Sequence, residues 1–97
     1  MVKNMVVLKL NEQATEERLA ALEAALSALP GKIEHIRSYA FGRNLGIVAG
    51  TWDFGIVSEF DDEAGYLAYA EHPEHQHVVT EVLRPLIAER ASVQFRI

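Results

Sequence analysis

The first segment of the chain is apolar on both faces of a predicted strand, and this feature restricts the fold more than any other. Within residues 2–10, Val6 and Leu8 share one face, whereas Met5 and Val7 share the other. Successive side chains of a strand point to opposite faces of its sheet. Apolar residues on both faces are typical of a strand at the centre of a sheet that is covered on both sides. We therefore predict a central strand over residues 2–10.

The remaining elements follow one another in an order that belongs to few folds. Thr15 is a good N-cap for a helix with a leucine stripe, and Pro30-Gly31 is predicted to stop that helix. Further strands are predicted over residues 33–43, 52–60 and 91–97. Two helices lie between the last two strands, and Asp61-Asp62 is predicted to cap the first of them. The order β-α-β-β-α-α-β matches the split βαβ pattern, so we predict an α+β, ferredoxin-like fold with an antiparallel sheet.

A ferredoxin-like sheet has helices on one face only, which leaves the second face to be covered. Met5 and Val7 lie on that second face of the first strand. The corresponding face of the third strand carries Gly55 and Val57 between acidic residues. Exposed apolar patches mark interaction surfaces, and a two-fold dimer is the commonest way to cover one. We therefore predict a homodimer that forms through the sheet.

Composition disfavours several classes of partner and chemistry. From its length, the chain is expected to be a single domain over residues 1–97. Its formal charge of −5 argues against a nucleic-acid partner, which requires a concentrated basic face. The chain has no run of four Lys or Arg residues that would favour an anionic membrane. The apolar stretch from Met5 to Leu8 is too short for a signal peptide or a spanning helix. With no cysteine, and hence no disulfide or thiolate chemistry, we expect a cytoplasmic protein.

Three of the four histidines fall within six positions of the sequence. Pro73 is favoured at the first position of a helix, and Pro85 is predicted to break that helix near its end. The apolar face of the helix consists of positions 78, 79, 82, 83 and 86. At ~100° per residue, His75 lies on this face, whereas His77 points about 160° away from it, toward water. His72 precedes the proline, at the elbow between two helices.

A histidine on an apolar face has two interpretations. As a core residue, His75 would be hydrogen-bonded to a nearby hydroxyl or backbone carbonyl. As a functional residue, it would be a neutral imidazole whose pKa is lowered by burial, and it would act as a general base. His72 and His75 also have the one-turn spacing of metal ligands, but Pro73 interrupts the helix between them and no third ligand is evident. We therefore expect no bound metal and no cofactor.

Several stretches of the sequence resemble one known family. They are Val7-Leu8-Lys9-Leu10, Leu29-Pro30-Gly31-Lys32-Ile33, Gly42-Arg43-Asn44-Leu45, Phe60-Asp61-Asp62 and Tyr69-x-x-His72-Pro73-Glu74-His75. On these residues the chain resembles the stress-responsive dimeric α/β-barrel (Dabb) family over essentially its whole length. The resemblance implies a ferredoxin-like protomer that pairs with a second copy to form a dimeric α/β barrel.

The resemblance also implies residues for a reaction. A plant member of the family closes a linear polyketide by intramolecular aldol condensation, and its catalytic tyrosine and histidine lie in a similar segment. By this likeness, Tyr69 corresponds to the tyrosine and His75 to the histidine that acts as general base. Many relatives have a histidine on the first strand where this chain has Asn4. Asn4 shares the face of Val6 and Leu8, which directs it toward the same pocket, but it cannot transfer a proton at neutral pH.

Two classes of function remain open. In the first, the chain is a cofactor-independent, cyclase- or lyase-like enzyme that holds a small apolar carbonyl compound, such as a polyketide, in a pocket between sheet and helices. The residues that bind the substrate would be Asn4, Val6, Leu8, Phe54, Ile56 and Val79, with His75 and Tyr69 as the catalytic pair. In the second, the chain is a non-catalytic, stress-responsive or ligand-binding dimer in which His75 and Tyr69 form a buried hydrogen bond. Cofactor-independent monooxygenases share the dimeric barrel and remain a further alternative by fold alone.

Overall fold

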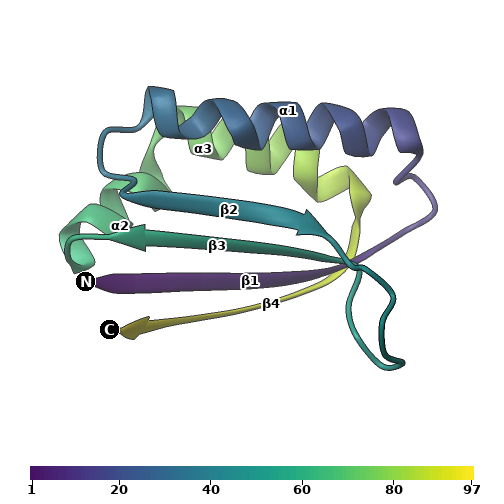
Figure 1. Ribbon diagram of the computed structural model, residues 1–97. Coiled ribbons are helices and arrows are strands. Elements are labelled where there is room, and N and C mark those ends of the chain that lie inside the picture. Colours follow the sequence, from purple (N-terminus) through teal and green to yellow (C-terminus); the bar gives the residue numbers. More distant parts are fainter.

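The computed structural model describes residues 1–97, which form a four-stranded sheet and a layer of helices (Figure 1). The strands are β1 (Val2–Leu10), β2 (Ser38–Arg43), β3 (Phe54–Phe60) and β4 (Ile87–Arg96). The helices are α1 (Glu16–Lys32), α2 (Glu63–Glu71) and α3 (Pro73–His77). α3 continues into a π-helical turn, η1 (Val78–Leu83), and a 3-10 turn, η2 (Arg84–Leu86).

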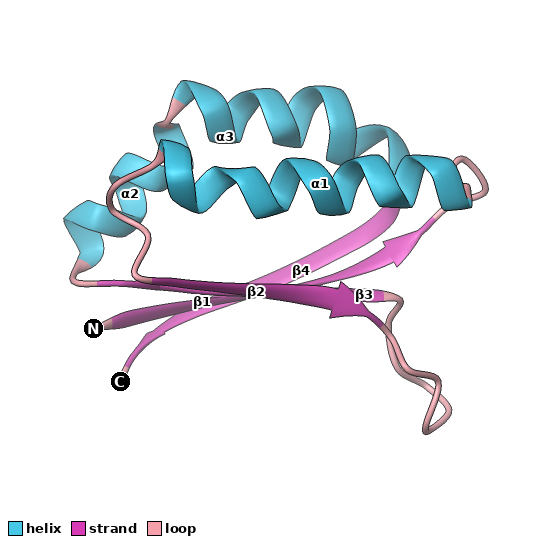
Figure 2. Cartoon of the chain, turned by 45° about the horizontal axis from the view of Figure 1, so that its top comes forward, coloured by secondary structure: helices cyan, strands magenta, loops and turns pink.

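The sheet is antiparallel throughout and has the strand order β2-β3-β1-β4. α1 and α3 lie side by side over one face, and no segment of the chain covers the other face (Figure 2). β1 is therefore central, as its two apolar faces predict, and the predicted ferredoxin-like order is confirmed. None of the helices combines the length and the apolar character that crossing a membrane requires.

The core lies between α1 and the covered face of the sheet. Thr15 caps α1 as predicted, because its hydroxyl accepts a hydrogen bond from the backbone N–H of Arg18 at 3.3 Å. Asp62 likewise caps α2. The stripe that α1 buries consists of Leu19, Leu22, Leu26 and Leu29. It belongs to one cluster with the inward residues of β1 and β3, which are Val6, Leu8, Phe54, Ile56 and Phe60.

α1 extends beyond its predicted stop at Pro30. Pro30 lies inside the last turn, and the helix ends at Lys32. A proline removes its own N–H and crowds the carbonyl four residues earlier, but the backbone N–H of Ile33 still donates to the carbonyl of Leu29 at 3.0 Å, which closes the final turn. Because Ile33 is buried as the C-cap of α1, β2 begins at Ser38 and not at the predicted residue 33.

Two further strands differ in extent from the prediction. β3 begins at Phe54 and not at residue 52. β4 begins at Ile87 and not at residue 91, so it is longer than predicted. Residues 87–90 lack an alternating apolar pattern, but Ile87, Glu89 and Arg90 pair antiparallel with β1, and the register shift in this pairing leaves Ala88 without a partner. The pairing partner, which the sequence does not show, therefore decides where β4 starts.

The helix that begins at Pro73 is not a uniform α-helix. After α3 it widens into η1, where the backbone N–H of Arg84 donates to the carbonyl of Val79, five residues earlier. η1 ends at Leu83, and η2, which contains Pro85, leads directly into β4, so the predicted break is confirmed. A π-type hydrogen bond spans one residue more than an α-helical one. The apolar face that the sequence predicts is nevertheless kept: Val78, Leu83 and Leu86 are buried, and Val79 and Val82 are partly buried.

The uncovered face of the sheet is apolar. Met5 and Val7 of β1 point to it together with Val93 and Phe95 of β4, and Val93 is 54% exposed. The loop between β2 and β3 bends toward the same side (Figure 2), and its Leu45 is 84% exposed. Exposed apolar residues gathered in this way mark a surface for interaction.

Candidate functional site

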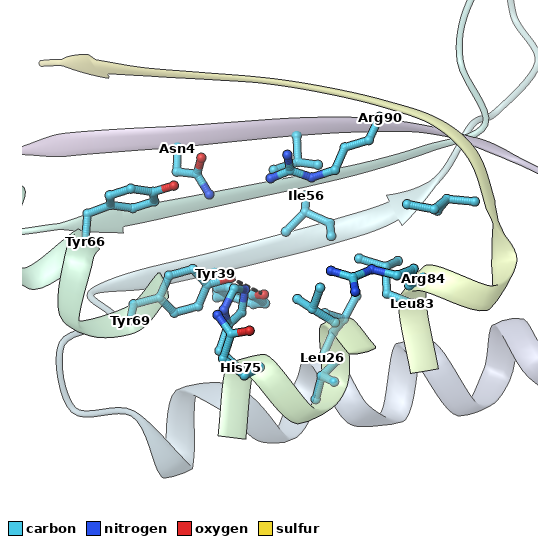
Figure 3. Close-up of a pocket in the computed structure, with 15 residues that line it drawn as sticks. Asn4, Leu26, Tyr39, Ile56, Tyr66, Tyr69, His75, Leu83, Arg84 and Arg90 are labelled. Carbon is cyan, nitrogen blue, oxygen red and sulfur yellow. Dashed lines mark hydrogen bonds between the residues drawn. The ribbon is translucent and has the colours of Figure 1, made fainter. Parts of the chain in front are cut away.

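A cavity of about 240 Å³ lies between the helices and the covered face of the sheet (Figure 3). It is lined by Asn4, Val6, Leu26, Tyr39, Ile56, Tyr66, Tyr69, His75, Gln76, Val78, Val79, Leu83, Arg84, Ile87 and Arg90. Ten of these 15 residues are hydrophobic. The cavity touches both His75 and Tyr69, a feature that favours a ligand site over a close-packed core.

His75 is oriented by the start of α3. Pro73 begins that helix, and Nδ1 of His72 caps it by accepting a hydrogen bond from the backbone N–H of Glu74 at 3.1 Å. Nδ1 of His75 lies 3.1 Å from the carbonyl oxygen of Ala70. A carbonyl oxygen only accepts, so Nδ1 carries the hydrogen and the lone pair of the neutral ring is on Nε2. Nε2 has no hydrogen-bond partner in the chain, which leaves it free for a ligand.

The imidazole of His75 is neutral at pH 7. Burial lowers its pKa below the ordinary value of 6.5. The hydrogen bond to the Ala70 carbonyl opposes this shift, whereas the charges of Arg90 and His72 add to it. His75 is half-buried, more open than the core position that the apolar stripe predicts, because it lies at the wall of the cavity. The lone pair of Nε2 is therefore available as a base.

The lowered pKa of His75 predicts how stability depends on pH. The unfolded chain, with the ordinary histidine pKa of 6.5, binds a proton before the folded chain does as the pH falls. Stability that is fully present above about pH 6.5 is therefore lost as the pH falls through the folded-state pKa. In urea denaturation at a series of pH values, we expect the free energy of unfolding to fall more steeply below pH 6.5 for the wild type than for His75→Gln. Parallel curves would contradict the assignment.

Tyr69 is 4% exposed and lies beside Tyr39 at the cavity. Their hydroxyl oxygens are 3.1 Å apart, a hydrogen bond in which either group can donate. The ring of Tyr69 packs on the ring of His75, with centroids 4.2 Å apart and planes inclined by 40°. The Tyr69–His75 hydrogen bond of the non-catalytic interpretation is absent, because the Tyr69 hydroxyl is bonded to Tyr39. Burial raises the pKa of both tyrosines, so both stay protonated at neutral pH.

Asn4 points into the cavity, as its position on β1 predicts. It is 4% exposed, and its Nδ2 donates to the hydroxyl of Ser58 at 3.3 Å. Its Oδ1 accepts a hydrogen bond from Nε2 of Gln94 at 2.9 Å. These residues are direct neighbours across the sheet, since β1 pairs with β3 on one side and with β4 on the other. The network satisfies a buried amide in an otherwise mostly apolar wall.

The Asn4 network makes a specific prediction for stability. Asn4→Leu removes the partner of the fully buried Ser58 hydroxyl, and an unsatisfied buried group costs about 1–3 kcal/mol. The double variant Asn4→Leu/Ser58→Ala removes both polar groups, so we expect it to recover part of that loss. Urea denaturation of the two variants measures the difference. A double variant less stable than Asn4→Leu would contradict the pairing.

The predicted apolar wall is correct in part. Val6, Ile56 and Val79 line the cavity. Leu8 and Phe54 do not, which corrects the prediction for both. They are register partners on β1 and β3, and both are buried in the core. Strand alternation identifies the face on which a residue lies, but not how far along that face a cavity extends.

Other polar side chains reach the cavity although the sequence analysis missed them. Tyr39 comes from β2, where the alternation of aromatic and small residues is a signal that could have identified it. Arg84 lies in η2, and because the helical count at ~100° per residue places it about 180° from His75, that count did not indicate it. Arg90 lies in the unpredicted part of β4, opposite Leu8.

The three clustered histidines do not form one group. His72 caps α3 at the elbow, and His77 is exposed, as predicted for both. The Nδ1 atoms of His72 and His75 are each engaged with the backbone. No three His, Asp or Glu side chains of the chain gather in a way that could hold a metal ion.

The family model of the stress-responsive A/B barrel domain (Dabb) matches residues 2–97. The chain belongs to this family. An uncharacterized protein of Streptomyces coelicolor is 36% identical over 78 residues, which are 78% of this chain and 80% of that protein. This match confirms the resemblance to the Dabb family.

Solved structures of similar proteins agree with the fold of this Dabb chain. A dimeric ferredoxin-like protein of unknown function from Thermobifida fusca has a TM-score of 0.92 and 34% identity, with 99% of this chain and 90% of that chain covered. A hydroxynitrile lyase from Passiflora edulis has a TM-score of 0.87 and 17% identity, with 99% of this chain and 92% of that chain covered. At 17% identity, the likeness to the lyase is one of fold alone.

Proposed function

We propose that this Dabb protein binds a small, largely apolar carbonyl compound and removes a proton from the carbon beside the carbonyl, without a cofactor. One observation carries the proposal: Nε2 of His75 has a free lone pair at a cavity that also holds the Tyr39–Tyr69 hydroxyl pair. A neutral base and hydroxyl donors at one apolar cavity suit proton abstraction next to a carbonyl. Figure 3 shows the imidazole of His75 close to these hydroxyls.

The proposed step requires one base and one oxyanion donor. The electrons of the broken C–H bond move to the carbonyl oxygen, and the proton moves to Nε2 of His75. The Ala70 carbonyl holds Nδ1–H throughout, which keeps the ring in one orientation. A single hydrogen bond joins the two tyrosine hydroxyls, so one hydroxyl hydrogen remains free to donate to the enolate oxygen.

A substrate with a second carbonyl would allow the enolate to continue to an aldol product. The enolate carbon attacks the second carbonyl carbon and forms a C–C bond, which closes a ring when both groups belong to one molecule. The new alkoxide then takes the proton back from the imidazolium of His75, so the base is regenerated. This sequence needs no oxidant, reductant or metal. The mostly apolar lining supports an apolar substrate body.

We also propose that the protein is a homodimer through the uncovered sheet face. The face exposes Met5, Val7, Val93 and Phe95, and the loop with Leu45 projects toward the same side. Apolar surface of this kind is stabilised when a second copy covers it. The similar protein from Thermobifida fusca is described as dimeric.

Deuterium exchange tests the proposed chemistry without knowledge of the natural substrate. Phenylacetone (1-phenyl-2-propanone) carries an aromatic body and acidic protons beside its carbonyl. In D2O at neutral pH, we expect the protein to accelerate the loss of the benzylic proton signal beyond the rate with an equal concentration of free imidazole. Binding of phenylacetone without faster exchange would support the non-catalytic, ligand-binding alternative instead.

A further inference from the structure

Two arginines at the cavity have no partner within the chain. The Lys and Arg side chains in ion pairs are Lys3, Lys9, Lys32, Arg37, Arg43 and Arg96. Arg18 donates a hydrogen bond to the side chain of Gln13. Of the nine Lys and Arg residues, only Arg84 and Arg90 make neither an ion pair nor a side-chain hydrogen bond, and both line the cavity. The chain has 14 Asp and Glu residues, so a shortage of carboxylates does not explain this.

The cavity offers these arginines no carboxylate to pair with. No Asp or Glu lines the cavity. Arg90 is the register partner of the buried Leu8, which directs its side chain to the covered face of the sheet. Burial raises the pKa of Tyr69 and lowers that of His75, and the charge of Arg90 opposes the first shift and adds to the second, so Arg90 lies close to the proposed catalytic pair. Figure 3 shows the guanidinium groups of Arg84 and Arg90 extending toward the middle of the cavity from η2 and β4.

We propose that the ligand of this cavity is an organic carboxylate, whose carboxylate group binds Arg84 and Arg90 while its apolar body lies against the aromatic wall. The proposal names the substrate class of the site described above and rests on the proposed function for what happens to the bound molecule. A guanidinium presents a planar fork of donors that matches a carboxylate. Both arginines are exposed, so they remain hydrated until the ligand replaces the water.

An apolar carboxylate fits the site better than a free phosphate does. Phosphate sites in proteins commonly use uncapped helix N-termini or glycine-rich loops, whereas no glycine lines this cavity and the start of α3 is already capped by Nδ1 of His72. Ten of the 15 lining residues are hydrophobic, which suits a ligand with an apolar body and one charged end. With the charged end at Arg84 and Arg90, the body extends toward Tyr69 and His75, where the proposed proton transfer takes place.

A pair of matched probes tests the proposal. Benzoate and benzamide have nearly the same shape, but only benzoate carries a charge. By isothermal titration calorimetry at pH 7.5, we expect the wild type to bind benzoate with a Kd at least about tenfold lower than that for benzamide. In Arg84→Gln/Arg90→Gln this preference is expected to disappear while benzamide binding persists. Arg18→Gln, which removes a cation away from the cavity, is expected to keep the full preference.

Three results would overturn the proposal. The first is equal affinity of the wild type for benzoate and benzamide, or binding of neither. The second is an unchanged preference in the double arginine variant. The third is inorganic phosphate binding as tightly as benzoate, because that would assign the arginines to a free anion and not to an apolar carboxylate.

The binding result is separable from the proposed proton transfer. His75→Gln keeps both arginines, so we expect it to retain the preference for benzoate while losing exchange activity. A wild type that prefers benzoate but exchanges no proton refutes the chemistry and leaves the ligand class standing. A wild type that exchanges the proton of phenylacetone but does not prefer benzoate refutes the ligand class alone.

Discussion

A His75→Gln variant is expected to lose the acceleration of phenylacetone proton exchange by about 100-fold or more, because a positioned general base contributes ~10²–10⁴ in rate. Glutamine has a similar length and can donate to the Ala70 carbonyl as Nδ1–H does. It has no lone pair of comparable basicity to take the proton. Proton NMR in D2O, which follows the benzylic signal over time, measures the rate directly.

The control for this experiment is two residues away. His77 is exposed and does not line the cavity, so His77→Gln removes a histidine from the same helical segment and is expected to keep the wild-type rate. Melting temperatures of both variants at pH 7.5 test whether they remain folded. If folded His75→Gln exchanges the proton as fast as the wild type, His75 is not the base.

Val7→Asp is expected to convert the proposed dimer into a monomer. Val7 is 41% exposed in the single chain, and its cross-strand neighbours on the open face are Gly55 and Ala91, which leave room for the new side chain. In a two-fold dimer the change would bury two unpaired carboxylates, at a cost of several kcal/mol. This corresponds to an increase of the dimer dissociation constant by about 100-fold or more. Sedimentation velocity over a range of protein concentrations measures the shift.

A matched variant separates dissociation from a general effect of charge. Ala20→Asp adds the same charge on the exposed side of α1, in the helix layer and away from the open sheet face. We expect it to sediment as the wild type does. A folded Val7→Asp protein that remains dimeric at low micromolar concentration would refute an interface through this face.

The fold followed closely from local patterns in the sequence. The alternation in β1 identified it as a central strand, and Thr15 and Asp62 marked the starts of α1 and α2 correctly. The predictions were wrong at the ends of helices and strands, where contacts with residues distant in the sequence outweigh the local sequence signals. The buried Ile33 prolonged α1 past Pro30, and pairing with β1 started β4 at Ile87.

The candidate site was only partly predictable. The helical count correctly directed His75 inward and His77 to solvent. Strand parity directed Asn4, Val6 and Ile56 to the covered face of the sheet, and all three line the cavity. The same parity also selected Leu8 and Phe54, which are in the core. Leu8 and Phe54 share a face with the residues that line the cavity, and only the extent of the cavity along the strands distinguishes them from those residues.

By itself, the sequence determined the order of elements, the face on which each regular side chain lies, and the family, because these depend on periodicity and on residues close in the chain. Tertiary structure decided that the Tyr69 hydroxyl bonds to Tyr39 and not to His75, and that Arg84 and Arg90 join them at one cavity. These four side chains come from α2, β2, η2 and β4. Their meeting depends on the packing of the helix layer against the sheet, which no local pattern encodes.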